Sequence, residues 1–459
     1  MQITLMIIIF LLFLLLGILI VSKKKAKYQL LLNNVFWIWI SWGGCLGLYF
    51  FSGIKYKYEL NLYSFLYIIM YWLFFFLGQF LASTKKRFVY QKDEKKAYEN
   101  EKKINFVPLF LISLYSIVIY IIVLFKNNDG LILGITRDIS SNSLMTLLLV
   151  LSNCSLIIWL YEISYSILNE QKISVIAIAS AVIYNLPVVL LSGRDAMIIF
   201  LVSTCICLFY CGSYVKDVLK REGKVYEKIK RILFVFIIVI ILYMVFISTN
   251  RYGQNVDSAI NMFVWTTNCE FPEYLKNLYY RFGGIGKVLL NFVFYYSSQF
   301  SKFAIIFDNY EGPYMGGLFQ FHYLSRLFPD SWDMSYSLVS NSLYEITKEV
   351  GLPGIKGFWE TAIGYTIYDF GKIGALIMSF LVGFFVEKIN IYCSNNATIL
   401  KLIFKVVLCV GMFLTVELSP FFDYYYIFPL FWIILLLFKY NSGIREKRKE
   451  YQNKFRRII

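Results

Sequence analysis

The chain has 459 residues, of which 59% are hydrophobic, 19% are aromatic and only 16% are charged, and its formal net charge is +16. A soluble domain is nearer half apolar and a quarter charged, so a single globular core cannot bury this much apolar surface. The composition therefore indicates a membrane protein with several spans and excludes a soluble enzyme.

Long apolar runs follow one another along the sequence. Backbone groups in lipid must be hydrogen-bonded within their own segment, so each span is expected to be a helix of about 20 apolar residues. We expect eleven spans, at 3–21, 29–51, 61–82, 106–125, 144–163, 174–191, 196–214, 232–249, 373–387, 402–418 and 424–438. The predicted fold class is therefore an all-α polytopic membrane protein.

Basic residues gather in four segments that border these runs. The segments are 23–27 after the first span, 85–103 after the third, 216–231 after the seventh, and 445–457 in the tail. With eleven spans all four lie on one side of the membrane, which the positive-inside rule makes the cytoplasmic side. The N-terminus is then expected outside and the C-terminus inside. This distribution accounts for the positive charge without a nucleic-acid partner.

The expected topology divides the chain into four parts. They are spans one to eight at 1–249 with a short outer turn at 192–195, a large extracytoplasmic loop at 250–371, three further spans at 372–438, and a basic cytoplasmic tail at 439–459. Long ordered loops usually carry function. Within this loop, Val288–Phe307 is apolar enough to lie in the membrane interface or to re-enter the bilayer.

The outer side of this topology carries charged residues that need an explanation. They are Arg194 and Asp195 in the short turn, Arg251 after the eighth span, and Arg281, His322, Arg326, Glu360 and Asp369 in the large loop. Plain alternatives exist: the turn pair can be solvated, Arg251 can snorkel at a span end, and His322 can be a packed loop residue. The two loop carboxylates can pair with nearby lysines. Taken together, arginines on this side suit a phosphate-bearing ligand, because guanidinium binds phosphate oxygens bidentately and stays charged.

Aromatic residues accompany these arginines in the large loop. They are Trp265, Tyr279, Tyr280, Tyr295, Tyr296 and Trp359. Aromatic rings stack on sugar faces, although an interfacial aromatic belt also accounts for several of them. A polyprenyl-diphosphate-linked oligosaccharide would explain the apolar, cationic and aromatic features together. The sequence has no nucleotide-binding loop, dinucleotide fingerprint or zinc-ligand spacing, so neither a cofactor nor a metal is expected.

Four features together resemble the Wzy-type oligosaccharide repeat-unit polymerases of bacterial surface polysaccharides. They are the outer "SGR" turn, an arginine after the next outward span, the large loop, and the closing stretch "ETAIGYTIYDFGKIGALIMSFLVG", in which Tyr368–Gly374 matches best. The resemblance implies a GT-C-like, metal-independent glycosyltransferase in the bacterial cytoplasmic membrane. Such an enzyme moves a growing glycan from undecaprenyl diphosphate onto an incoming lipid-linked repeat unit, and a chain-length regulator is its expected partner.

The resemblance also implies functional arginines in two outer loops. Arg194 matches the shorter loop and Arg251 the start of the longer one. Arg281 and Arg326 lie farther along the longer loop and are also substrate-binding candidates. The base that accepts the proton of the attacking hydroxyl is a choice among three residues, Glu360, Asp369 and His322.

Two other functions remain as alternatives to the polymerase. An O-antigen-type ligase has the same reaction class and a similar layout. A flippase or other transporter should show paired repeats, broken helices or ionisable residues inside its spans. The predicted spans are nearly free of charge in their middles, and polar residues concentrate in one outer loop, which favours an enzyme at the outer face.

Overall fold

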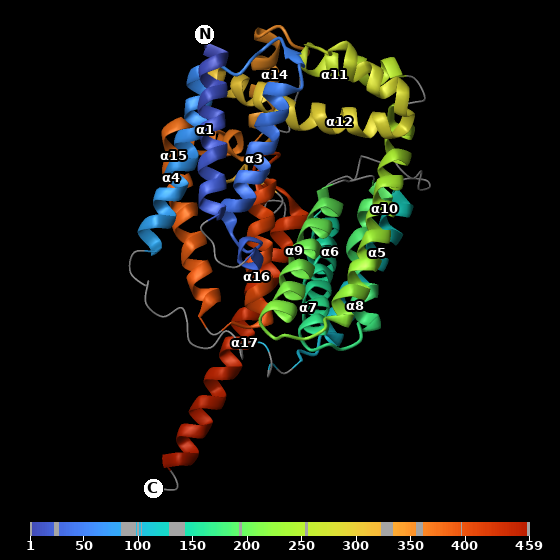
Figure 1. Ribbon diagram of the computed structural model, residues 1–459, viewed down its shortest axis with the longest axis vertical. Coiled ribbons are helices and arrows are strands. Elements are labelled where there is room, and N and C mark those ends of the chain that lie inside the picture. Colours follow the sequence, from blue (N-terminus) through green and yellow to red (C-terminus); the bar gives the residue numbers. More distant parts are fainter. Residues whose placement is uncertain are drawn as a thin grey trace.

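The protein is a bundle of helices that carries a helical cap at one end (Figure 1). The structure, a computed structural model, describes residues 2–22, 27–83, 98, 101, 103–127, 143–191, 195–252, 256–322, 334–354, 361–395 and 397–456. Within these ranges the strands are β1 (Lys55–Tyr56) and β2 (Cys269–Glu270), which form one antiparallel pair. This pair ties the connection between α3 and α4 to the cap.

Each predicted span overlaps one helix or two consecutive helices. In chain order these are α1 (Gln2–Ser22), α2 (Lys27–Leu30), α3 (Asn34–Phe51), α4 (Leu62–Ser83), α5 (Val107–Asn127), α6 (Ser143–Ser152), α7 (Cys154–Leu168), α8 (Val175–Leu191), α9 (Asp195–Asp217), α10 (Lys224–Tyr252), α15 (Ala362–Ser394), α16 (Ile399–Leu414) and α17 (Tyr424–Arg456). Among the described residues, six stretches are long and apolar enough to cross a membrane, at 34–51, 62–83, 107–126, 144–168, 196–217 and 362–394. They agree with an all-α membrane protein, whereas the count of eleven spans stays a prediction.

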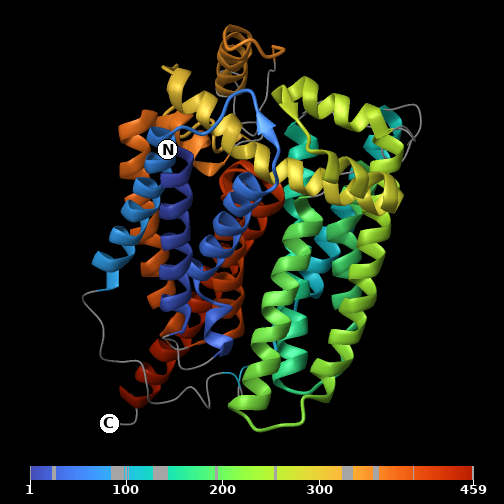
Figure 2. The same cartoon turned by 45° about the horizontal axis from the view of Figure 1, so that its top comes forward.

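Buried apolar side chains gather in two main clusters. One takes its side chains mainly from α5 to α10 together with α16 and α17, and Figure 2 shows α5 to α10 as one group of helices. The other takes them mainly from α1, α3, α4 and α15 together with the second half of α12. Helix α16 contributes residues to both clusters and therefore joins the two halves of the bundle.

Helices α4 and α15 approach each other so closely that their backbones touch. A Cβ atom added at Gly78 of α4 would lie 2.1 Å from the carbonyl oxygen of Phe380, and one added at Gly383 of α15 would lie 2.1 Å from that of Phe75. Small residues at helix contacts allow this kind of approach in membranes. The two glycines thus make α4 and α15 one tightly packed pair.

The large loop folds into a cap formed by α11 (Val256–Thr267), α12 (Glu273–Asn309) and α14 (Met334–Glu349). Helix α12 lies across the end of the bundle rather than along it (Figures 1 and 2). Its backbone leaves the helical region at Gly283 (φ 53°, ψ −124°), a conformation that favours glycine, so the helix changes direction there. The apolar segment Val288–Phe307 falls in the second half of α12, beyond this break.

The two termini lie at opposite ends of the bundle. The start of α1 is at the cap end, and α17 extends from the other end (Figure 1). The connection between α9 and α10, with its basic residues, also lies away from the cap (Figure 2). Termini at opposite ends fit an odd number of spans. The assignment of the cap to the outer side stays a prediction from the basic residues.

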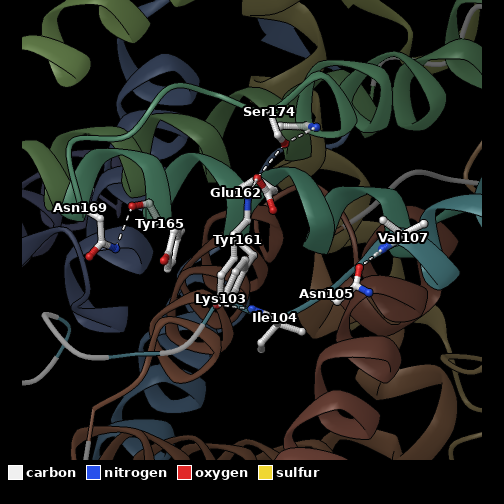
Figure 3. A network of polar contacts seen from close by, with 10 residues as sticks. Lys103, Ile104, Asn105, Val107, Tyr161, Glu162, Tyr165, Asn169 and Ser174 are labelled. Atoms are coloured by element: carbon white, nitrogen blue, oxygen red, sulfur yellow. Dashed lines mark hydrogen bonds and ion pairs between the residues drawn. The ribbon is translucent and has the colours of Figure 1, made fainter.

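A polar network fixes the segment that leads into α5 against α7 (Figure 3). Lys103 Nζ pairs with Glu162 Oε2 at 2.9 Å, and Ser174 Oγ donates to the same oxygen at 2.7 Å. The amide of Ile104 donates to the hydroxyl of Tyr161 at 3.2 Å. Glu162 is buried, and its carboxylate is stabilised by the pairing with Lys103 and the hydrogen bond from Ser174.

Candidate functional site

The structure describes part of the predicted site. The predicted residues with described side chains include Arg281, His322 and Asp369. Arg251 lies in the last turn of α10, and only its backbone is described. The predicted residues outside the described part of the chain are Arg194, Arg326, Glu360 and the aromatic Trp359.

Asp369 holds the cap to the start of α15. Its side chain is buried, and Oδ1 and Oδ2 accept hydrogen bonds from the amides of Phe319 and Gln320, each at 3.0 Å. Its own carbonyl oxygen accepts a hydrogen bond from the amide of Gly316 at 2.8 Å. Both carboxylate oxygens therefore accept hydrogen bonds from backbone amides of the turn that leads to His322. This geometry gives Asp369 a positioning role and does not support its prediction as a base.

His322 ends that turn and is packed between aromatic rings. Its ring stacks on Tyr336 of α14 with the centroids 4.6 Å apart, and on Phe422 with the centroids 5.7 Å apart. The side chain is only 2% exposed. This arrangement matches the packed-residue alternative, in which the histidine joins the cap to the connection between α16 and α17.

The connection between α16 and α17 carries two buried carboxylates, Glu417 and Asp423. Tyr296 Oη of α12 donates to Glu417 Oε2 at 3.3 Å. Asp423 Oδ1 accepts from the amide of Tyr425 at 2.8 Å, so this residue caps the start of α17. Both carboxylates lie at the cap end of the bundle, on an element that contacts α12.

Two fully buried polar side chains near this connection have no hydrogen-bond partner among the described residues. Both amide atoms of Gln299 on α12 are unpartnered, and so is Oγ1 of Thr361, which immediately precedes α15. Buried polar groups are almost always hydrogen-bonded in proteins, so these atoms are expected to have a partner beyond the described residues, such as a water molecule or a polar ligand.

Helices α8 and α9, which precede and follow Arg194 in the chain, contact α10 and α17 respectively. In the last turn of α8, the carbonyl oxygen of Val189 accepts a hydrogen bond from Tyr243 Oη of α10 at 2.8 Å. In the second turn of α9, Ile199 lines the same narrow gap as Tyr425 at the start of α17. The facing ends of α8 and α9 therefore lie between α10 and the connection from α16 to α17.

Helix α10 also meets α12, close to the break in that helix. A Cβ atom at Gly284 would lie 2.8 Å from Val245 Cγ1 of α10. Arg281 precedes this contact on α12 and is exposed. Arg251 follows Val245 by six residues, about 9 Å along the helix. The elements that carry or flank Arg194, Arg251 and Arg281 thus come together at the cap end.

The exposed side of α12 around the break is apolar. Phe282, just before the break, is 52% exposed, and three apolar residues that follow the break at helical spacing are 45% to 57% exposed, namely Ile285, Leu289 and Phe292. On a membrane protein, an apolar face of a helix that lies across the bundle suits contact with lipid. Arg281 immediately precedes Phe282, so an exposed cation adjoins this apolar surface.

A shallow hollow of about 580 Å³ lies elsewhere on the cap. It is lined by Pro313, Leu338, Asn341, Ser342, Tyr344 and Glu345. None of the residues predicted from the sequence lines this hollow. It is therefore a surface separate from the predicted site.

The sequence interpretation did not single out Glu417, Asp423 or Gln299. A signal for the two carboxylates was present, because "VELSPFFD" places two acidic residues and a proline between two apolar runs. Ionisable residues inside a membrane bundle are rare and often functional. Gln299 had no comparable signal, because a glutamine in a long loop is ordinary and its burial depends on the tertiary fold.

The chain was also compared with known proteins. No protein-family model matches it, and no curated protein or solved structure matches it.

Proposed function

We propose that this protein is a membrane glycosyltransferase that polymerises undecaprenyl-diphosphate-linked oligosaccharide repeat units into a surface polysaccharide. The observation that carries the proposal is the meeting of three elements, α8, α10 and α12, beside a lipid-facing apolar surface. These elements carry or flank Arg194, Arg251 and Arg281. A substrate with a lipid tail and a diphosphate fits a cationic region next to lipid.

The proposed reaction follows from the chemistry of this donor. A hydroxyl of the acceptor sugar attacks the anomeric carbon of the donor, and the bond from that carbon to the diphosphate oxygen breaks. The electron pair leaves with the lipid diphosphate, whose growing charge the arginines stabilise. The donor brings its own leaving group, so no nucleotide is consumed at the membrane surface. A basic side chain takes the proton of the attacking hydroxyl.

The remaining features of the proposal come from the sequence. The enzyme has a GT-C-like fold with eleven spans in the bacterial cytoplasmic membrane, its N-terminus and cap outside, and its tail in the cytoplasm. Its partners are the lipid-linked repeat unit, the growing polymer and a chain-length regulator. It requires no metal or cofactor, and the chain binds no nucleic acid.

A flippase or other transporter is the second candidate, and one observation favours it. Asp369, Glu417 and Asp423 are buried carboxylates at the cap end of the bundle, and transporters often place such groups in their substrate pathway. Two of the three accept hydrogen bonds from backbone amides. Structural roles of this kind weaken the case for transport.

Deletion of the gene in its host tests the proposal and separates it from the alternatives. The surface glycan of the deletion strain, separated on a gel, should show single repeat units without a ladder. A ligase mutant would instead accumulate full-length polymer on the carrier lipid, and a flippase mutant would retain single units on the cytoplasmic side. An unchanged ladder would contradict all three functions.

A further inference from the structure

Glu417 lies in a buried region to which three elements contribute. Tyr296 of α12 donates to its carboxylate at 3.3 Å. Two residues earlier in the chain, the carbonyl oxygen of Thr415 accepts from the amide of Ala362 at 2.8 Å, which attaches the start of α15 to the same connection. Glu417 is therefore enclosed by α12, the start of α15 and its own connection.

Trp42 of α3 joins this connection to α12 a second time. Its Nε1 donates to Thr415 Oγ1 at 3.0 Å, and its ring contacts the ring of Phe300 with the centroids 5.9 Å apart. Gln299 precedes Phe300, and it lies one helical turn after Tyr296, so Gln299 and Tyr296 are neighbours on the helix surface. The contacts thus bring Gln299 close to the connection that carries Glu417.

The unpartnered atoms around Glu417 define the chemistry of a ligand. Gln299 offers an amide that donates and accepts, and Thr361 offers a hydroxyl that does both. Leaving such groups unpaired in a buried place is unfavourable, so a polar occupant is expected. A carboxylate repels a phosphate but accepts well from a hydroxyl. The combination therefore suits a neutral ligand that is rich in hydroxyl groups, which is a sugar.

The other buried carboxylates at the cap end have different tasks. Asp369 uses both oxygens to hold backbone amides, and Asp423 caps α17. Glu417 is held by a side-chain hydroxyl of the helix that lies across the bundle. Farther along the same chain segment, Tyr425 lines one gap with Ile199, which lies in the second turn of α9. Arg194 immediately precedes that helix.

We infer that Glu417 is the base of the proposed glycosyl transfer and that Gln299 and Thr361 bind the acceptor sugar; this inference rests on the proposed function. Glu417 takes the proton of the acceptor hydroxyl while its oxygen forms the new bond to the anomeric carbon. The lipid diphosphate departs with the electron pair of the broken bond. Donor and acceptor are thus bound by different chemistry, arginines for the diphosphate and a carboxylate with an amide and a hydroxyl for the sugar.

The test uses the full-length protein in lipid nanodiscs and the lipid-linked repeat unit extracted from the deletion strain. Glu417→Gln should reduce turnover by about 100-fold or more, the usual contribution of a general base, while the KM changes less than threefold. Glu417→Asp should retain part of the turnover. Gln299→Ala and Thr361→Ala should instead raise the KM, with a smaller effect on turnover.

Glu162→Gln is the matched control, because Glu162 is also a buried glutamate but belongs to the network that joins α7 to the segment leading into α5. It should lower thermal stability and keep the turnover of the folded protein. If Glu417→Gln turns over at the wild-type rate, the inference is wrong and the polymerase proposal still stands. If wild-type protein forms no polymer from this substrate, the proposed function itself is wrong.

Tyr296→Phe provides a second measurement in case Glu417→Gln does not fold. The phenyl ring keeps the shape of the side chain and removes only the hydroxyl that donates to Glu417. This variant should be stable and should lose turnover several-fold with little change in the KM. An unchanged turnover in Tyr296→Phe, together with an unchanged KM in Gln299→Ala, would overturn the inference.

Discussion

Arg194 lies in the short turn, and Arg251 lies at the start of the large loop, that the sequence predicts to be on the outer side. In the proposed reaction each would bind the departing diphosphate, so replacing either with alanine should abolish the polysaccharide ladder. Lysine at either position should restore little activity. The ladder is read on a gel and the protein level on an immunoblot.

Arg221→Ala is the control for these two substitutions. Arg221 lies at the end of the bundle away from the cap, where its guanidinium donates to the carbonyl oxygen of Leu168 at 3.3 Å. Its loss should leave the ladder intact. Normal ladders from both Arg194→Ala and Arg251→Ala would mean that these arginines only mark solvated span ends.

Asp369 should matter for stability more than for the chemical step. In Asp369→Ala the amides of Phe319 and Gln320 lose a charged acceptor. A hydrogen bond to a charged group contributes about 1.5–3 kcal/mol, so the loss of two should amount to about 3–6 kcal/mol and lower the melting temperature of the purified protein. Asparagine should have an intermediate effect. A melting temperature equal to that of the wild type would contradict the positioning role.

Glu101 gives the fold a dependence on pH. Its Oε2 accepts from the amide of Ile399 at 2.7 Å, at the start of α16, and burial raises its pKa from 4.5 to about 7 against the effect of this hydrogen bond. The folded state then favours the protonated form more than the unfolded chain does. This contribution to stability is complete below pH about 4.5 and is lost as the pH rises through about 7.

The measurement is the melting temperature of the purified protein between pH 5 and about 8. The wild type should become less stable across this interval. Glu101→Gln, which cannot ionise, should show a smaller change. If the melting temperatures of the two proteins change with pH in parallel, ionisation of the Glu101 carboxyl does not affect the stability of the fold.

At the scale of elements, the sequence predicted the helices of the bundle well. A long apolar run in lipid has to form a helix, because each backbone group needs a hydrogen-bond partner within its own segment. The predicted run at 3–21 accordingly overlaps α1, and the run at 232–249 lies inside α10. The boundaries differ where polar residues continue a helix beyond its apolar part, as in α10, which begins at Lys224.

The cap and the buried polar residues could not be predicted in the same way. The direction of α12 depends on one backbone conformation at Gly283 and on its contact with α10, and neither has a periodic signal. The partners of Glu417 and Asp369 come from segments far away in the sequence. Sequence patterns locate a carboxylate, but its hydrogen bonds decide whether it positions a loop or faces a ligand.

The contact between α4 and α15 gives a prediction at the same scale. Gly383→Ala would place a methyl group against the α4 backbone, which can only yield by moving the helix. Overpacking of this kind typically costs about 1–3 kcal/mol, so the melting temperature should fall. Gly44→Ala on α3 is the control, because a Cβ there meets nothing within 4 Å. Equal melting temperatures for the two variants would contradict the close contact.

At the scale of the whole molecule, the orientation in the membrane is open to a direct test. The eight native cysteines are free and either buried or half-buried, so a membrane-impermeant maleimide should label them little. Asn341→Cys on the cap and Lys228→Cys near the start of α10 introduce exposed sites at opposite ends. The first should react in intact spheroplasts and the second only after permeabilisation. The reverse pattern would invert the predicted topology.

The backbone contact between α4 and α15 has a consequence for the route of the proposed lipid-linked substrate. Where two backbones touch, no acyl chain or polyprenyl tail can slide between them. Lateral access from the bilayer is therefore closed on that flank of the bundle. In the proposed reaction, the membrane-bound donor is expected on the other flank, where α12 exposes an apolar face beside α10.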